Sequence, residues 1–315
     1  MSEPDNWERN TLEKLAFSAL QEQRRARHWS IFFKMLTFAY LFILLFIFFG
    51  WADKGESPIG GKHTALVEMH GVIAANGEAS ADKVIGGLQD AFKDKNTKGI
   101  ILRINSPGGS PVQAGYIYDE IKRLRAKYPD IPLYAVVEDI CASGGYYVAA
   151  AADKIYVDKA SIVGSIGVLM DGFGFTDSLK KLGVERRLLT AGENKGFLDP
   201  FSPMSGKQKE FAQTMLQEIH QQFIKAVRQG RGKRLKETPE MFSGLFWTGE
   251  KSIEMGMADA LGSTEYVARD VLKAEDIVDF TIQEGIAERF AKRFGATMIN
   301  SVNPLAQGAA GITLK

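Results

Sequence analysis

The sequence has few of the residues that build metal sites and disulfide bonds. Among its 315 residues there is one cysteine, Cys141, and the few histidines are far apart. They are His28, His63, His70 and His220. A single thiol cannot form an internal disulfide, and zinc ligands normally cluster at short spacing. We therefore expect no metal site.

An excess of either charge is also missing. The chain has 39 lysines and arginines against 38 aspartates and glutamates, a formal net charge of +1. Nucleic-acid binding normally relies on a strongly positive field, so we expect no nucleic-acid partner. With 45% hydrophobic and 24% charged residues, the composition is that of a folded globular protein rather than a disordered one.

Motifs that hold nucleotides are missing as well. Gly61-Lys62 is followed by His63 and lacks the earlier glycine of a phosphate-binding loop. Gly172-Phe-Gly174 is followed by Asp177 at the position where a dinucleotide-binding fingerprint has its third glycine. We therefore expect no nucleotide and no other cofactor.

One long hydrophobic run is present near the N-terminus. Residues 35–52 carry no charge, and together with residues 31–33 they would form a helix of about 30 Å, the thickness of a bilayer core. A buried soluble helix would rarely be apolar on every side, and a cleaved signal peptide would have a shorter apolar stretch. We predict an uncleaved transmembrane anchor over residues 31–52.

The basic residues on the two flanks predict how this anchor is oriented. Those at its beginning are Arg24, Arg25, Arg27 and Lys34, and those behind it are Lys54 and Lys62. By the positive-inside rule, residues 1–30 lie in the cytoplasm and the chain after residue 52 lies across the membrane. Residues 53–63 have the Gly, Pro and Ser content of a linker.

Short apolar runs and helical patterns alternate through the next part of the chain. The runs expected to form strands are residues 64–69, 99–104, 132–137 and 154–157, with helical patterns between them. This alternation predicts an α/β domain with mainly parallel strands, for which we take residues 64–280.

Two amphipathic stripes predict helices in the second half of the chain. The first stripe, in a helix expected over residues 205–228, consists of Phe211, Met215, Ile219 and Phe223 and is expected to be buried. The second lies in residues 281–315, which we predict to be a C-terminal amphipathic helix and a flexible tail. This helix could pack on the core, meet another subunit or rest on lipid.

Two glycine-rich turns carry the candidates for chemistry. Ser143 begins a predicted helix that a short connection, Glu138-Asp-Ile140, joins to a strand ending near Val137. At the start of a helix the dipole stabilises an alkoxide, and the next backbone N–H can help to bind an oxyanion. Capping the helix is the alternative role of this serine. The turn Ser106-Pro-Gly-Gly109 follows another strand, and its glycines would let N–H groups approach a bound carbonyl, although a tight turn uses the same residues.

Three other side chains are weaker candidates. Cys141 could be a nucleophile, but a small packing residue is the simpler interpretation. His70 could form a serine–histidine pair or occupy an ordinary turn after the first strand. His220 lies on the long predicted helix, and we expect it to be structural.

The order of these motifs resembles the signal peptide peptidase A family of membrane-bound serine peptidases. The matching motifs are Asn105-Ser-Pro-Gly-Gly-Ser110, Ala142-Ser-Gly-Gly-Tyr-Tyr147, Gly164-Ser-Ile-Gly167 and Gly192-Glu-Asn-Lys-Gly196. The resemblance covers roughly residues 64–274 and is to the short form, which has one copy of the domain. It implies a Clp protease/crotonase-like domain behind one transmembrane helix.

The resemblance also implies roles for individual residues. By motif, Ser143 is the nucleophile, Lys195 is the general base, and Ser165 hydrogen-bonds the lysine. The backbone N–H groups of Gly109 and Gly144 form the oxyanion hole. Without the resemblance, Lys195 would be an ordinary solvated lysine and Ser165 a residue of a glycine-rich turn.

The same resemblance implies partners and a location. It implies a ring-shaped homo-oligomer in the bacterial inner (plasma) membrane, with the catalytic domain in the periplasm and the anchor in the lipid bilayer. The substrates would be hydrophobic peptides, chiefly signal peptides left after secretion. Two further hypotheses are a catalytically silent, membrane-anchored scaffold that binds extended peptides, and acyl-CoA chemistry on the same fold.

Overall fold

The computed structural model describes residues 5–52 and 61–283 of the chain. These residues belong to two units, an N-terminal helix and a domain described over residues 61–283, and each is described by itself. The predicted linker over residues 53–63 and the predicted C-terminal helix and tail over residues 281–315 lie mostly outside the described residues. Both stay predictions.

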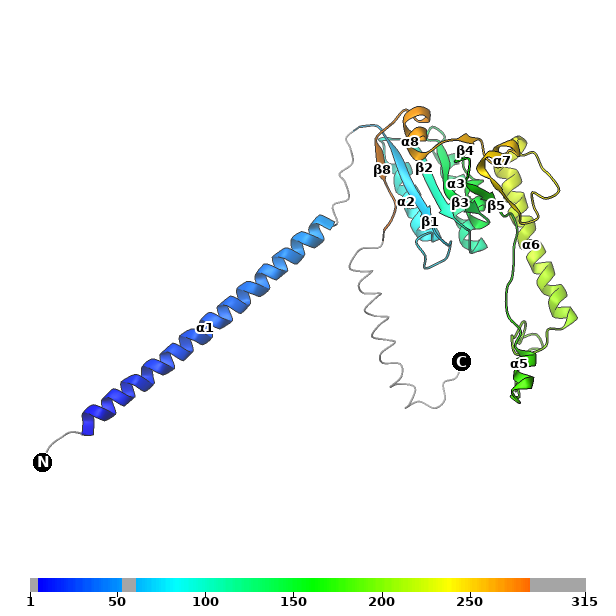
Figure 1. The fold of residues 1–315 in the computed structure, drawn as a ribbon. Helices are drawn as coiled ribbons and strands as arrows, with labels where there is room; N and C mark the ends of the chain where they lie inside the picture. The colour runs from blue at the N-terminus through cyan, green and yellow to red at the C-terminus, as the bar shows by residue number, and fades with distance from the viewer. Residues whose placement is uncertain (1–4, 53–60, 284–315) are drawn as a thin grey trace. The chain divides into compact units, whose positions relative to one another are not determined.

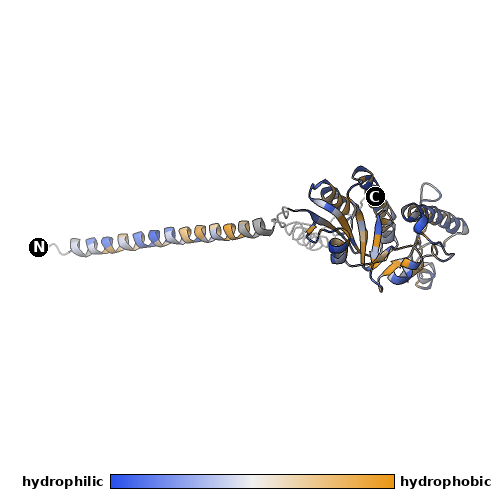
Figure 2. Ribbon diagram, turned by 90° about the horizontal axis from the view of Figure 1, so that it is seen from above, coloured by the Kyte–Doolittle hydropathy of each residue, from blue (hydrophilic) through white to orange (hydrophobic). Residues whose placement is uncertain are grey.

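The first unit is one continuous helix, α1 (Asp5–Ala52). Residues 10–46 within it are long and apolar enough to cross a membrane, and none of the side chains in its most apolar window is buried inside the protein. Figure 2 shows the change from a polar first half to a hydrophobic second half. The length and composition of this helix suit the membrane-spanning role predicted for residues 31–52.

The second unit is built on one mainly parallel, eight-stranded sheet (Figure 1). Its strands are β1 (His63–His70), β2 (Thr97–Ser106), β3 (Leu133–Ala142), β4 (Lys154–Val157), β5 (Ile162–Gly164), β6 (Phe246–Thr248), β7 (Ala260–Leu261) and β8 (Ile277–Asp279). The order is β6-β5-β3-β2-β1-β8, and β4 pairs with β3 and β7 beside this path. Among the described strands only β5 and β6 pair in antiparallel fashion. The predicted α/β fold with mainly parallel strands is confirmed.

Helices cover both faces of the sheet and enclose two cores. They are α2 (Ala81–Lys93), α3 (Pro111–Lys127), α4 (Gly144–Ala149), α5 (Thr176–Lys181), α6 (Gly206–Arg231), η1 (Gly232–Arg234), α7 (Gly249–Glu254), α8 (Thr264–Tyr266) and η2 (Val267–Val271). The larger core includes residues of α2, α3 and α4, and the smaller core includes residues of η2. The alternation of side chains along a strand fills both, since Ile100 and Leu102 of β2 lie in the larger core and Ile101 lies in the smaller one.

An irregularity in β3 directs the chain toward the candidate site. Residues 134–136 of β3 pair with β4, whereas residues 140–142 pair with β5. Between them the register with β2 shifts, because Ile104 lies opposite Val137 but Ser106 lies opposite Cys141. Such a bulge bends a strand. The strand therefore continues past the predicted end at residue 137, because its last residues find a new partner in β5.

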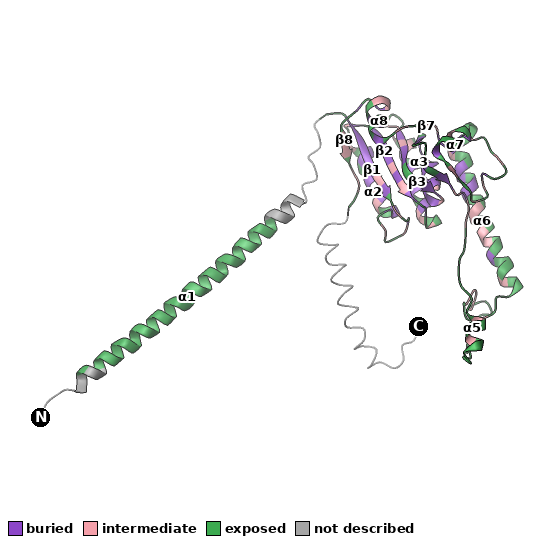
Figure 3. Ribbon diagram, viewed as in Figure 1, coloured by how far each residue is buried: buried purple, intermediate pink, exposed green. Residues whose placement is uncertain are grey.

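A long excursion separates β5 from α6. Residues 168–205, which we call the arm, leave the sheet after β5 and include α5 (Figure 1). Most of the arm is exposed (Figure 3). It is held together by its own contacts, since the Phe175 N–H donates to the Pro200 carbonyl at 2.7 Å and the Phe175 ring stacks on Phe201 at a centroid distance of 5.6 Å.

The buried stripe predicted for α6 is only partly correct. Phe223 is 4% exposed, but Phe211 is 64% exposed, and Met215 and Ile219 are half-buried. The first turns of α6 extend beyond the sheet, and the later turns pack on the body of the domain (Figure 1). The periodicity identifies one face of the helix, but only part of that face is covered.

A buried ion pair fixes the end of α6. Arg231 is almost fully buried and donates to both carboxylate oxygens of Asp259, at 2.8 and 3.0 Å. The carboxylate of Asp259 also accepts the Ile155 N–H of β4 at 2.7 Å. Burial alone would raise the pKa of Asp259, but the hydrogen bonds and the charge of Arg231 outweigh it and lower this pKa below its ordinary value. The pair thus joins α6, β4 and the segment before β7.

Asp259→Asn is expected to lower the free energy of unfolding by about 3 kcal/mol, because the buried guanidinium loses its counter-charge. In the wild type, the lowered pKa of Asp259 contributes stability at pH values above the ordinary value near 3.9, and this stability is lost as the pH falls through the native pKa. Urea unfolding of the detergent-solubilised protein, from pH 7 downward, measures both effects. Asp90→Asn, at a site where the side chain is 62% exposed, is the control. Equal stability of the Asp259 variant and the wild type would contradict the role of the pair.

Candidate active site

Ser143 lies where the bulged strand β3 meets helix α4. Its φ is 51°, a left-handed value that costs free energy for a residue with a Cβ. Its backbone N–H donates to the Gly164 carbonyl at 2.8 Å, which supports this conformation. In the described part of the chain the Ser143 hydroxyl makes no capping bond to α4, whereas Ser110 does cap α3. The geometry disagrees with the capping alternative and leaves the hydroxyl available for chemistry.

A turn of two glycines brings the backbone against Ser143. Gly108 has a φ of 98°, and a Cβ there would lie 2.6 Å from the Gly144 nitrogen and 2.8 Å from the Ser143 Cβ. A Cβ built on Gly144 would lie 3.3 Å from the Gly109 nitrogen, so the backbone donors of these two glycines are close together. The Ser106 Oγ accepts the Gly108 N–H at 3.1 Å and holds the turn in place.

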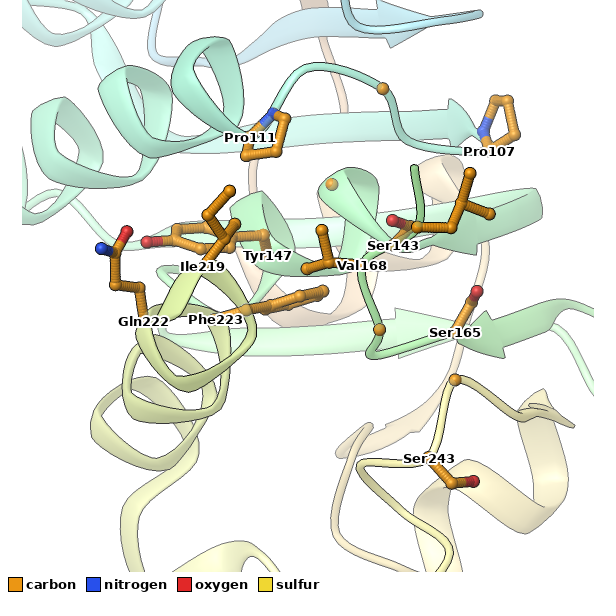
Figure 4. A pocket seen from close by; sticks show the side chains of 15 residues that line it. Pro107, Pro111, Ser143, Tyr147, Ser165, Val168, Ile219, Gln222, Phe223 and Ser243 are labelled. Carbon is orange, nitrogen blue, oxygen red and sulfur yellow. The ribbon is translucent and has the colours of Figure 1, made fainter. Parts of the chain in front are cut away.

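A cavity of about 570 Å³ opens over this junction (Figure 4). Four of the five predicted site residues line it, namely Gly109, Ser143, Gly144 and Ser165. Much of the remaining wall is apolar and consists of Pro107, Pro111, Tyr147, Val168, Leu169, Ile219 and Phe223. The cavity therefore combines a hydroxyl, two backbone N–H groups and a hydrophobic wall, which suits a carbonyl that is attached to apolar groups.

Ser165 follows β5 and borders the same cavity as Ser143 (Figure 4). Its φ is 52°, and its N–H donates to the Leu245 carbonyl at 2.7 Å. The hydrogen bond between Ser143 and Gly164 joins the two serine segments directly. The structure thus brings together two serines that are 22 positions apart in the sequence, each with a left-handed backbone.

Lys195 is the one predicted site residue that does not line the cavity. It lies in the arm, is exposed, and is not among the residues that line the cavity. The apolar side chains that follow it, Phe197 and Leu198, are half-buried. Phe197 packs against Phe211 with ring centroids 5.5 Å apart. In this structure, Lys195 therefore does not lie in the cavity with Ser143.

The rival candidates do not line this cavity either. Cys141 is fully buried, and burial raises the pKa of its thiol far above the ordinary value, so no thiolate is available at neutral pH. His70 lines a separate cavity of about 160 Å³, which argues against a pair with Ser143. His220 does not line the cavity, and its Nε2 lies 3.1 Å from the Ile166 carbonyl oxygen.

Two backbone contacts of this site were not predicted from the sequence. Gly108 makes the closest approach to Gly144, although Gly109 was the glycine singled out. Gly164 supplies the carbonyl that holds Ser143. The available signals were the adjacent glycines of the turn and the Gly-Ser pair after a strand, but neither shows which backbone atom will make the contact.

Comparison with known proteins identifies the family of the domain. Residues 125–278 match peptidase family S49. A Methanocaldococcus jannaschii protein named as a protease is 34% identical over 210 residues, which cover 67% of each chain. The chain belongs to peptidase family S49. The S49 match contains Ser143, Ser165 and Lys195, whereas Gly109 precedes it.

Two further relatives show how far the similarity extends. An Enterococcus faecium protein named after signal peptide peptidase SppA is 29% identical over 250 residues, or 76% of this S49 chain and 72% of that protein. A Brucella melitensis protein named Na(+)/H(+) antiporter NhaA is 45% identical over 202 residues, or 62% of this chain. The match spans only 27% of the length of that protein, so the antiporter name is not carried over to this chain.

Gly108→Ala is expected to lower the free energy of unfolding by at least about 2 kcal/mol, because its Cβ would be strained and would collide with the Gly144 nitrogen. Gly115→Ala in α3 is the matched control. Its Cβ would meet nothing within 4 Å, and alanine is better than glycine inside a helix by about 0.5–1 kcal/mol. Urea unfolding of both variants measures the difference. A Gly108→Ala protein as stable as Gly115→Ala would show that the two backbones do not approach this closely.

Proposed function

We propose that this protein is a membrane-anchored serine endopeptidase with a Ser-Lys dyad. The observation that carries the proposal is the position of Ser143. Its hydroxyl caps no helix and lines the cavity beside the backbone N–H groups of Gly109 and Gly144. Membership of a peptidase family supports hydrolysis of peptide bonds as the reaction.

The proposed reaction uses these groups in turn. A neutral Lys195 amine accepts the proton of the Ser143 hydroxyl, and Oγ bonds to the peptide carbonyl carbon. The carbonyl oxygen becomes an oxyanion that accepts hydrogen bonds from Gly109 and Gly144. The C–N bond then breaks, the lysine ammonium protonates the leaving amine, and an acyl-enzyme remains. Water attacks this ester with the lysine again as base, which releases the acid and restores Ser143. Ser165 would hold the lysine by a hydrogen bond.

The dyad requires that Lys195 come from a neighbouring subunit. The exposed apolar side chains in and next to the arm support such a contact, since a monomer rarely leaves so many of them in one region. They include Leu169, Phe173, Leu182, Val184, Leu189, Met204 and Phe211. The arm of one subunit would pack on the next, bury these groups and carry Lys195 into the cavity beside Ser143. Head-to-tail repetition of this contact closes a ring.

The proposed substrates are hydrophobic peptides, chiefly signal peptides left in the bilayer after secretion. The apolar wall of the cavity supports this choice, and an anchor such as α1 would keep the domain beside the membrane. Arg24, Arg25 and Arg27, ahead of the apolar run, support a cytoplasmic N-terminus and a periplasmic domain at a bacterial inner membrane.

A catalytically silent scaffold is the second candidate, and one observation favours it. Among the residues that the structure describes, those that line the cavity include neither lysine nor histidine, so this part of one subunit holds no such base beside Ser143. Such a scaffold would bind extended peptides by strand addition. Labelling with a fluorophosphonate distinguishes the two, because only an activated serine forms an adduct at Ser143.

Ser143→Ala is expected to lower the hydrolysis of a hydrophobic peptide at least about a thousandfold, because the nucleophile is lost. Lys195→Arg is expected to be equally inactive, since a guanidinium stays charged and cannot accept the proton. Steady-state hydrolysis by the purified protein measures both. Ser205→Ala, which removes the cap of α6, should cost about 1 kcal/mol of stability but retain activity. Turnover by a pure Ser143→Ala protein would remove this residue from the mechanism.

Mixing inactive subunits tests the shared site. If Ser143 and Lys195 meet across an interface, random co-assembly of Ser143→Ala with Lys195→Ala subunits in equal amounts restores about a quarter of the sites. Co-assembly of Ser143→Ala with the double variant restores none and is the control. The absence of recovered activity in verified mixed oligomers would exclude the shared site.

A further inference from the structure

Three hydrogen bonds from three different parts of the domain hold the turn that carries Ser165. They are Ser143 N–H to the Gly164 oxygen at 2.8 Å, Ser165 N–H to the Leu245 oxygen at 2.7 Å, and His220 Nε2 to the Ile166 oxygen at 3.1 Å. The first two join backbone to backbone and do not depend on the side chains. The third depends on a single side chain, that of His220.

Helix α6 fixes the position of His220 through the turn that follows it. Phe223 is buried and packs on Tyr147 of α4, with ring centroids 5.0 Å apart. Residues three apart lie on the same side of a helix, so this contact also fixes the direction of His220. Ile219 lines the cavity, but His220 does not, and its ring meets the Ile166 carbonyl instead.

The chemistry of the contact gives His220 one role. A carbonyl oxygen only accepts hydrogen bonds, so Nε2 must carry a hydrogen. Because the bond goes to the main chain and not into the cavity, it suits a side chain that holds structure rather than one that transfers protons to substrate.

We propose that His220 is a positioning residue that holds the Ser165 turn in its active conformation. The inference rests on the proposed peptidase function. Ser165 has a φ of 52°, a conformation that persists only where surrounding contacts enforce it. The side chain of Ile166 is fully buried, so packing around this side chain holds the turn. The hydrogen bond from His220 to the Ile166 carbonyl holds its backbone. Loss of the bond would let Ser165 move relative to Ser143.

Two substitutions of His220 separate the hydrogen bond from the packing of the ring. His220→Leu fills a similar space without a donor, whereas His220→Gln places an amide N–H at a similar reach. We expect His220→Leu to lower kcat about three- to tenfold, the effect of one lost hydrogen bond, with KM changed less than about twofold. We expect His220→Gln to keep kcat within about twofold of the wild type. Gln221→Leu, at the adjacent exposed position, is the control and should leave kcat unchanged.

Amide hydrogen exchange supplies a readout that does not need activity. We expect faster exchange in peptides that cover residues 162–170 of the His220→Leu protein, and wild-type exchange in His220→Gln. Wild-type kcat and exchange in His220→Leu would overturn the proposal, and so would a loss of thermal stability with unchanged kcat. If the wild-type protein hydrolyses no peptide, the proposed function fails by itself, and the exchange result still decides whether His220 holds the turn.

Discussion

The hydrogen bond from the Ser143 N–H to the Gly164 carbonyl ties the end of β3 to the end of β5, and the arrangement of the cavity depends on it. The bulge in β3 makes this bond attainable, because it lets the strand leave β4 and pair with β5 over its last residues. Ser143 then takes a left-handed φ of 51° in place of an ordinary helix-capping conformation. The free-energy cost of that conformation is offset by the sheet on one side and by α4 on the other.

The second constraint on the site is that the turn at Gly108 and Gly109 carries no side chains beyond Cα. The backbone of Gly108 approaches Gly144 so closely that a Cβ would lie 2.6 Å from its nitrogen. Two strand ends that are far apart in sequence can therefore bring two backbone donors to one place. A side chain at this contact would separate the donors, and the serine would then lie beside an ordinary surface turn.

Local sequence patterns predict the four longest strands, β1 to β4, but not the short strands β5 to β8, and the family motifs rather than local patterns single out most of the site. The continuous apolar run in β2 correctly indicates a buried strand, because side chains on both of its faces are covered. The extension of β3 to Ala142 depends on the change of its pairing partner from β4 to β5, and no local sequence pattern indicates that change. Phe211 shares the stripe of Phe223 but is 64% exposed, since periodicity identifies a helix face and not what covers it. Lys195 has no local signal at all, and only the family motif singles it out.

The two residues of the proposed dyad lie in very different surroundings. Ser143 lies at the junction of β3 and α4 between buried neighbours, whereas Lys195 lies on an exposed arm held mainly by its own contacts. In the proposed dyad, Lys195 on this arm would reach Ser143 only after another subunit had covered the apolar side chains around it. Burial of that surface would then supply the free energy that orders the arm, and the peptidase site would form only as the assembly forms. An isolated subunit would keep its strained serine but lack a base, so peptide hydrolysis would be coupled to assembly by geometry alone.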